Sequence, residues 1–349
     1  MEILQPGLGP IRSATYLPAD PSAVLWGHLP CATDSAVLTI DSGTEVTIDT
    51  ISHEGILEDQ GRDPRAFFGG FGATDFLDDA VALAASDRSR GDGGPHVVTG
   101  PIHVRGARPG DLLKFTVIET LPRVPYGVIS NRHGRGALPD EYPAAGEVVS
   151  VFAAVDGDHG TLPRVRGGSH SVRFPLAPFL GIMGVAVAGD VRPHSVPPGP
   201  HGGNIDINLL TVGSSLYIPV QADGALAYVG DPHFAQGDGE VALTAMEASL
   251  RATIRFDVVA HEDAVRDFGE LVGPLAETSE FLVPTGMDAD LDTAVQNCVR
   301  AAIGLLQARF GMDAEHAYAY LSAATDFNIS QVVDLVKGVH ARIRKADFS

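Results

Sequence analysis

Basic residues, cysteines and long apolar runs are scarce in this sequence of 349 residues. Only 24 Lys and Arg stand against 44 Asp and Glu, which gives a net charge of −20. Proteins that bind nucleic acid cluster positive charge, so this balance argues against such a partner. No apolar run approaches the roughly 18 to 20 residues that a membrane helix needs. We therefore predict a soluble protein with neither a nucleic-acid nor a membrane partner.

Cys31 and Cys298 are too few to form a disulfide framework. The first residues also lack the basic segment and apolar stretch of a secretory leader. Both observations favour a reducing cytoplasm. The motifs G-x-S-x-G, H-E-x-x-H and G-x-x-x-x-G-K-[ST] are absent as well, so the common serine-hydrolase, zinc-protease and phosphate-loop signatures do not apply.

Glycine and proline are abundant, with 40 and 24 residues spread along the whole chain. Average proteins contain about 7% glycine and 5% proline, so this chain has an excess of both. The spacing indicates many short strands joined by turns. Residues 36–40 and 45–49 alternate β-branched and polar side chains around a turn and predict a hairpin, and residues 99–120 predict another strand, turn and strand.

The period of the apolar residues divides the chain into three regions. Residues 1–150 are β-rich, with one short helix expected within 67–90, and residues 151–285 form a second β-rich region that holds the main candidate site. Residues 286–349 change to helical spacing, with a helix from Asp290, a second over 314–324 and a short third near 330–336. The fold class is therefore α+β but mostly β, with antiparallel sheets and a C-terminal helical segment packed on them.

The most concentrated set of polar side chains lies between residues 201 and 240. Asn204 and Asp206 are two residues apart, and so are Asp231 and His233, so each pair can share one face of an extended segment. Carboxylate and imidazole ligands suit zinc or a similar divalent ion. An EF-hand calcium loop does not fit, because its sixth position is glycine whereas the sixth residue from Asp231 is Gln236.

A simpler interpretation of the same segment is a glycine-rich hairpin with solvated acids, because Gly202 and Gly203 also suit an ordinary tight turn. Two such polar clusters about 30 residues apart favour a site. His53 joins the candidate catalytic residues because Glu54 adjoins it at the end of a predicted strand. Most other histidines, including His96, show no ligand pattern.

Four segments carry a family resemblance: 99–113 (TGPIHVRGARPGDLL), 174–188 (FPLAPFLGIMGVAVA), 202–249 (beginning GGNIDINLLTVGSSLYIPV) and 320–339 (YLSAATDFNISQVVDLVKGV). In these residues, and in order from about Val24 to Val339, the chain resembles the acetamidase/formamidase family. It departs from the family's short-chain amidases at 52–61 and 131–143, where loops commonly shape the pocket.

The resemblance implies a β-sandwich-like core, commonly a homodimer, and metal-dependent hydrolysis of a small linear amide to a carboxylic acid and ammonia. It implies Asp206 and His233 as metal ligands, with Asp231 as a third. Glu240 or Asp238 then acts as the base on a water molecule polarised by the metal.

The implied metal is a divalent ion, with zinc favoured and calcium or another ion as the alternative. Candidate substrate-binding residues are Asn204, Gln236 and the Gly202 and Gly203 turn, whose amides could bind the oxyanion. Two other functions remain open: a different carbon–nitrogen hydrolysis such as opening a cyclic amide, and noncatalytic metabolite binding by a β-sandwich.

Overall fold

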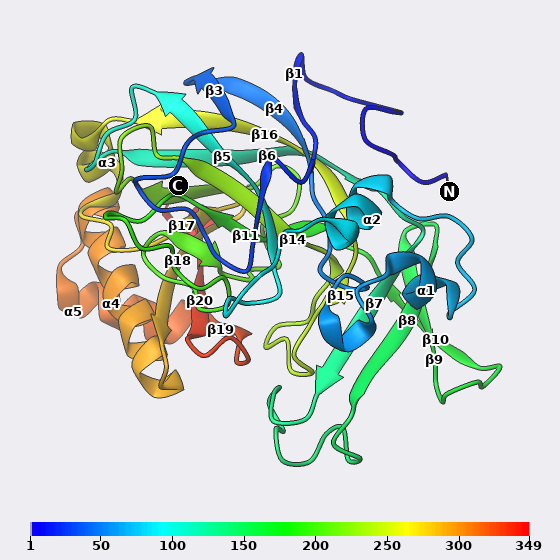
Figure 1. Ribbon diagram of the computed structural model, residues 1–349. Helices are drawn as coiled ribbons and strands as arrows, with labels where there is room; N and C mark the ends of the chain where they lie inside the picture. The colour runs from blue at the N-terminus through cyan, green and yellow to red at the C-terminus, as the bar shows by residue number, and fades with distance from the viewer. Residues whose placement is uncertain (1, 349) are drawn as a thin grey trace.

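The computed structural model describes residues 2–348, and two large β-sheets make up most of it (Figure 1). The first sheet has nine strands within these residues: β1 (Thr15–Leu17), β4 (Thr44–Asp49), β16 (Leu250–Val259), β6 (Leu112–Pro122), β13 (Ser215–Pro219), β17 (Leu275–Glu277), β18 (Phe281–Asp288), β20 (Lys337–Arg344) and β19 (Asp326–Gln331), in spatial order.

The second sheet has eleven strands within residues 2–348. Eight follow one another in space: β10 (Ser171–Pro175), β9 (His159–Pro163), β8 (Val148–Asp156), β7 (Tyr126–Arg132), β15 (Met246–Glu247), β14 (Ala227–Ala235), β11 (Phe179–Gly184) and β12 (Gly202–Asn204). The other three are β5 (Val97–Arg105), which pairs with β14, and β2 (Val24–Trp26) and β3 (Leu38–Asp41), which pair with β5.

Helices are short except near the C-terminus. They are η1 (Glu58–Gln60), α1 (Pro64–Gly69), α2 (Asp78–Ala85), α3 (His261–Phe268), α4 (Leu291–Phe310), α5 (Ala314–Ala324) and η2 (Lys345–Phe348). Helices α3, α4 and α5 gather on one side of the molecule (Figure 1). None of the helices in residues 2–348 is long and apolar enough to cross a membrane.

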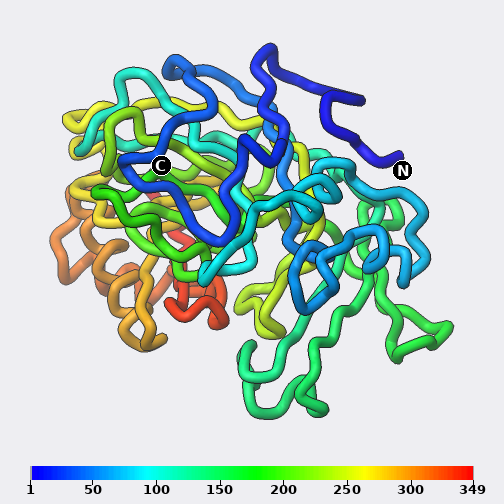
Figure 2. The backbone as a smooth tube through the Cα atoms, in the orientation of Figure 1, coloured from blue at the N-terminus to red at the C-terminus, as the bar shows by residue number. Residues whose placement is uncertain are grey.

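The predicted class, mostly β with C-terminal helices, is confirmed. One hydrophobic core contains side chains from both sheets, such as Phe115 and Ile254 from the first and Leu180 and Val229 from the second. Burying the inner faces of two sheets against each other is the arrangement expected of a sandwich-like core. The connections β7–β8 and β9–β10 project from this body (Figure 2).

The expected hairpin over 36–49 is wrong in its pairing. Both strands form, but β3 pairs with β5 in the second sheet, whereas β4 pairs with β1 and β16 in the first. The turn at Gly43, whose φ is +87°, therefore carries the chain from one sheet to the other. Local alternation predicts a strand but does not specify its partner.

The C-terminal helices begin and end where the sequence predicts. The side chain of Asp290 accepts the Thr293 amide at the start of α4, and Gly311 ends it with a left-handed φ of +65°. The expected third helix near 330–336 is wrong, because β19 continues to Gln331 and a loop follows. This loop carries Asp334 into the protein interior.

Strands from the three predicted regions alternate within the nine-stranded sheet. The strand β6 lies between β16 and β13, and β20 from the C-terminal region pairs with β18. The region boundaries at 150 and 285 stay predictions. This mixing matters for function because it brings distant loops to the ends and edges of β14.

Candidate active site

The candidate site is built around β14, which pairs with β11, β15 and β5. This strand carries Asp231 and His233, both buried, with His233 Nε2 3.2 Å from Asp231 Oδ2. Asp231 has a left-handed φ of +48°, and the β14–β15 register shifts after His233. The positions of Asp231 and His233 therefore depend on a strained residue and an irregular strand register, and not only on the alternation of side chains along a regular strand.

Asp206 and Glu240 share this unusual backbone. Both have a φ of +47°. A non-glycine residue in this region costs about 1 to 3 kcal/mol, and such residues cluster at functional sites. The sequence-based expectation that Asn204 and Asp206 lie on one extended segment is wrong, since β12 ends at Asn204 and Asp206 itself has a left-handed φ.

The three residues predicted to bind metal converge beside Gly181 of β11. A Cβ atom added there would lie 2.3 Å from Asp206 Oδ1, 2.7 Å from His233 Cε1 and 2.8 Å from Asp231 Oδ2. Both carboxylate oxygens of Asp206 and the Nδ1 atom of His233 are buried without a hydrogen-bond partner. Buried polar atoms are rarely left unpaired, so this cradle fits a cation.

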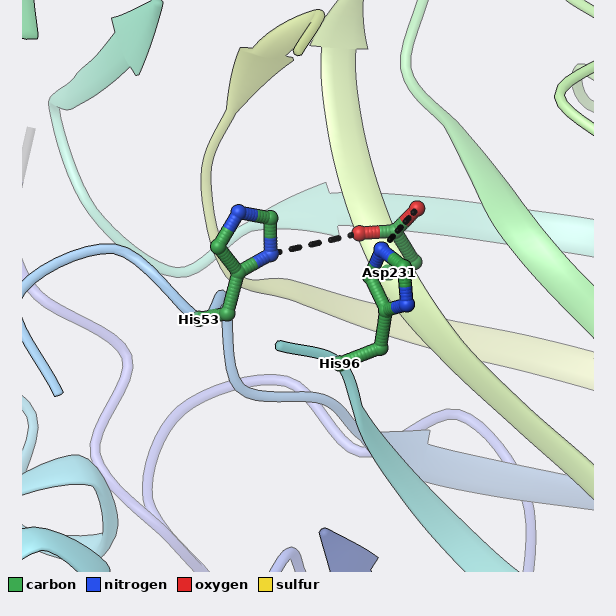
Figure 3. A group of neighbouring side chains, drawn as sticks. All are labelled: His53, His96 and Asp231. Carbon is green, nitrogen blue, oxygen red and sulfur yellow. Dashed lines mark ion pairs between the residues drawn. The ribbon is translucent and has the colours of Figure 1, made fainter. Parts of the chain in front are cut away.

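Two further histidines approach Asp231, as Figure 3 shows. His53 lies in the loop after β4, with its Nδ1 atom 3.5 Å from Asp231 Oδ1. His96 directly precedes β5, with its Nε2 atom 3.8 Å from Asp231 Oδ2. The other ring nitrogen of His96 is 3.1 Å from the hydroxyl of Ser195, a contact that orients the imidazole.

Glu247 of β15 and Asp334 complete the buried cluster, and with His96 they are the site residues that the sequence-based prediction missed. Glu247 Oε1 lies 3.0 Å from His233 Nε2. Asp334 faces Asp206, whose pKa its charge helps to raise. Glu247 and Asp334 lie inside the 202–249 and 320–339 segments that resemble the family, which was the available signal, whereas no local pattern marks His96.

Three groups of side chains within residues 2–348 could hold a metal ion, with donor atoms in each group within 4.8 Å of one another. They are His53 with His96 and Asp231, Asp206 with His233 and Glu240, and Asp231 with His233 and Glu247. Because the groups share Asp231 and His233, they form one continuous cluster. Its imidazole and carboxylate donors match the ligand chemistry of zinc and related divalent ions.

Burial controls ionisation in the cluster. It lowers the pKa of His96 to about 4, so this ring is neutral at pH 7, the form that binds metal. Burial by itself would raise the pKa of Asp231, but the imidazoles of His96 and His233 hold it well below the ordinary value. Burial and the nearby Asp206 raise the pKa of Glu240 well above the usual range.

Glu240 connects the cluster with a cavity. It is 8% exposed and lines a cavity of about 440 Å³, together with Gln236 and Asp238. Gln236 Nε2 donates to the backbone carbonyl of Asp206 at 2.8 Å. This bond ties the cavity wall to the strained backbone of Asp206, so Gln236 positions that residue.

The remaining predicted residues lie in different settings. Asp238 is exposed and accepts hydrogen bonds from Asn208, Asn328 and Arg342, which places it outside the three metal-binding groups. The Gly202 amide donates to the Gly199 carbonyl and is therefore engaged in a turn. The neighbouring Gly203 packs against His201 and Leu29. Asn204 is buried, and its side-chain oxygen has no hydrogen-bond partner.

Comparison with known proteins gives a consistent result. Residues 93–195 and 191–343 match the model of the Acetamidase/Formamidase family. A formamidase from Methylophilus methylotrophus is 28% identical over 306 residues, which cover 69% of this chain and 74% of the relative. An acetamidase from Mycolicibacterium smegmatis is 30% identical over 199 residues, or 42% of this chain and 49% of the relative.

The fold has solved counterparts. A crystal structure of an acetamidase from Yersinia enterocolitica superimposes with a TM-score of 0.75 and 24% sequence identity, covering 100% of this chain and 96% of that one. At this identity the likeness describes the fold alone. The family match covers most of the chain and confirms both the sequence resemblance and the enzyme class expected from it. The chain belongs to the acetamidase/formamidase family.

Proposed function

We propose that this protein hydrolyses a small linear amide to a carboxylic acid and ammonia, using a divalent metal. The observation that carries the proposal is the buried convergence of Asp206, Asp231 and His233 beside Gly181. The family match and the relatives named formamidase and acetamidase support the reaction class.

The metal would be held by Asp206, Asp231 and His233, with the neutral imidazole of His96 available beside Asp231. The mixture of imidazole and carboxylate ligands favours zinc. When bound, such an ion polarises the amide carbonyl and lowers the pKa of water. Glu247 lies 3.0 Å from His233 Nε2 and holds that ring in place, as carboxylates commonly do for ligating histidines.

Glu240 is the proposed general base and acid. Its carboxylate lies beside Asp206 and His233, the residue borders the cavity, and its raised pKa brings it nearer to neutrality, where proton transfer in both directions is efficient. It takes a proton from the attacking water and returns it to the nitrogen of the leaving group. An amine leaves far more readily than an amide anion, so the second transfer lets the carbon–nitrogen bond break.

His53 is a proposed positioning residue in the same reaction. Burial disfavours its charged form, but the contacts with Asp231 and Glu54 raise its pKa to about 10. It thereby orients Asp231. Asp238 is instead proposed to shape the cavity rim, because Arg342 and two asparagines use its oxygens.

Ammonia release from formamide and acetamide tests the proposal. Asp206→Ala and His233→Ala should each lower kcat/KM by at least about a hundredfold and reduce the bound metal measured by elemental analysis. Asp190→Ala and His170→Ala change exposed residues of the same types and should leave both readouts unchanged. Full activity of both site variants would refute the assignment, and full activity after complete chelation would refute the metal.

We also propose that the protein is a cytoplasmic homodimer, as the family resemblance implies. Light scattering of the purified protein would show about twice the chain mass of 36.5 kDa. A mass equal to a single chain would contradict the dimer.

A further inference from the structure

The cavity beside Glu240 is larger and more apolar than formamide or acetamide requires. Its volume is about 440 Å³, within the range of about 300 to 1,000 Å³ typical of pockets for much larger ligands. Its apolar wall comes from strands β7, β9, β10, β14 and β15. The side chains are Ile129, Leu162, Phe174, Pro175, Ala235 and Met246.

A glycine makes this wall continuous. Gly160 of β9 pairs with Phe174 of β10. A Cβ atom added at Gly160 would lie 2.7 Å from the Phe174 ring and 3.1 Å from the sulfur of Met246. Because residue 160 has no side chain, the aromatic ring can lie across β9 and approach Met246. The paired strands β9 and β10, whose connection projects from the body in Figure 1, thus supply part of the apolar wall.

Within residues 2–348, the cavity is lined by two charged side chains, Asp238, which is paired with Arg342, and Glu240, the proposed general base. No lysine or arginine is among the described residues that line it. Asp238 lies at its edge, where Arg342 donates to it at 2.9 Å and Asn328 at 2.8 Å. A carboxylate on the substrate would meet Asp238 and Glu240, and no lysine or arginine in the described part of the chain lines the cavity to pair with it, so the lining favours a neutral, apolar group.

We infer that this cavity receives the acyl group of the substrate, and that the preferred substrates are neutral amides of apolar acids with several carbons. This inference rests on the proposed function, because the reacting carbonyl must lie near Glu240. Glu240 is the member of the metal-binding cluster that lines the cavity, so the acyl chain extends from the reaction centre over Met246 and Phe174. Formamide and acetamide leave this surface uncovered.

A series of amides tests the inference on the purified metal-loaded enzyme. The kcat/KM for ammonia release is measured with formamide, acetamide, butyramide, hexanamide and phenylacetamide. Each methylene that leaves water for the apolar wall should raise kcat/KM by about threefold or more, up to hexanamide. Succinamic acid, an amide with a carboxylate at the far end, should be hydrolysed less well than butyramide.

The Ile129→Trp variant tests whether the acyl chain lies in this cavity. The indole fills part of the cavity and should lower the ratio of kcat/KM for hexanamide to that for formamide by at least about tenfold. Val191→Trp adds the same side chain at a position that is 76% exposed and outside the cavity, and it should leave the ratio unchanged. Circular dichroism of both variants checks their folding.

The outcomes separate the two proposals. If formamide and acetamide are hydrolysed but kcat/KM stays constant or falls as the acyl chain lengthens, this inference is overturned and the proposed function stands. An unchanged ratio in folded Ile129→Trp overturns the location of the acyl group. Failure to hydrolyse any amide overturns the proposed function and this inference with it.

Discussion

At the scale of single residues, the site depends on the absence of a side chain at Gly181 as much as on the groups around it. The backbone of β11 approaches three functional side chains so closely that even a methyl group has no room. Position 181 must therefore be glycine because the site leaves no room for a side chain. Many other glycines in the chain instead serve turns.

Gly181→Ala should therefore abolish activity while the protein stays folded. Its methyl group would lie 2.3 Å from Asp206 Oδ1 and occupy the space proposed for the cation. We expect kcat/KM for acetamide to fall at least about a hundredfold, with a parallel loss of bound metal. Gly304→Ala is the control, since nothing lies within 4 Å of the added atom there. Normal metal content in Gly181→Ala would show that the cation lies elsewhere.

Glu247 offers a second test at this scale. Its carboxylate lies 3.0 Å from His233 Nε2 and 3.9 Å from His53 Nδ1. Glu247→Gln keeps the size but removes the charge that orients the imidazoles, so metal affinity should weaken by about 10- to 100-fold. Titration with a competing chelator measures this affinity. Unaltered affinity would exclude the orienting role.

At the scale of elements, buried ion pairs join segments that are far apart in the sequence. Arg251 of β16 donates to Asp49 of β4 at 2.6 and 3.0 Å. The same guanidinium also donates to the backbone carbonyls of Gln5, Leu8 and Pro10. One side chain thus holds the N-terminal segment against the nine-stranded sheet.

Arg251→Ala should destabilise the fold strongly. The substitution leaves the buried Asp49 carboxylate with only the more distant Arg123, 3.6 Å away, and breaking a buried pair typically costs about 3 to 5 kcal/mol. Urea unfolding should show this decrease in the free energy of unfolding. Arg255→Ala removes an exposed ion pair on the same strand and should cost less than about 1 kcal/mol. Equal costs for the two variants would contradict the distinction.

The C-terminal η2 segment is attached by a pH-dependent contact. Burial opposes ionisation of Glu277, but Lys345 Nζ at 2.6 Å and the Tyr217 hydroxyl at 2.8 Å hold its pKa below the ordinary value. A carboxyl whose pKa is lower in the folded state stabilises the fold above its unfolded pKa of about 4.3, and this contribution disappears as the pH falls through the folded pKa.

Glu277→Gln should therefore cost about 1 kcal/mol at pH 7, where the contact is partly screened by solvent, and much less at pH 3. Unfolding of both proteins by urea at the two pH values measures the difference. A cost that is the same at both values would show that Glu277 acts through packing and not through its charge.

At the scale of the whole molecule, the protein buries an unusual density of carboxylates in one place. Burial raises the pKa of Asp206, Asp334 and Glu247, and the like charges of neighbouring carboxylates add to this effect in each case. A divalent cation offsets this repulsion. The sheets that enclose the cluster are therefore expected to depend on the ion for stability as well as for activity.

Removal of the metal by a chelator should lower the midpoint of thermal unfolding by several degrees and abolish ammonia release, and zinc should restore both. Differential scanning calorimetry and activity assays follow the two effects. In Asp206→Ala the chelator should shift the midpoint much less, because a ligand is already missing. A shift as large as that of the unaltered protein would place the stabilising ion outside this cluster.

Much of the fold follows from local sequence patterns. Alternation predicts the strands, and Asp290 and Gly311 predict both ends of α4. The pairing does not follow, because the strands before and after Gly43 join different sheets, and their partners β5 and β16 lie far along the chain. Strand propensity is local, whereas the choice of partner depends on which faces can be buried together.

The candidate site shows the same division between sequence and structure. By itself the sequence determined the mostly β class and the family, and it predicted Asp206, Asp231, His233 and Glu240 as a set of donors within glycine-rich segments. Only the tertiary structure brought in His96, Glu247 and Asp334 and moved Asp238 to the cavity rim. The physical reason is that a metal site is defined by convergence in space. Left-handed backbone turns and pairing between distant strands create that convergence, and no local spacing encodes it.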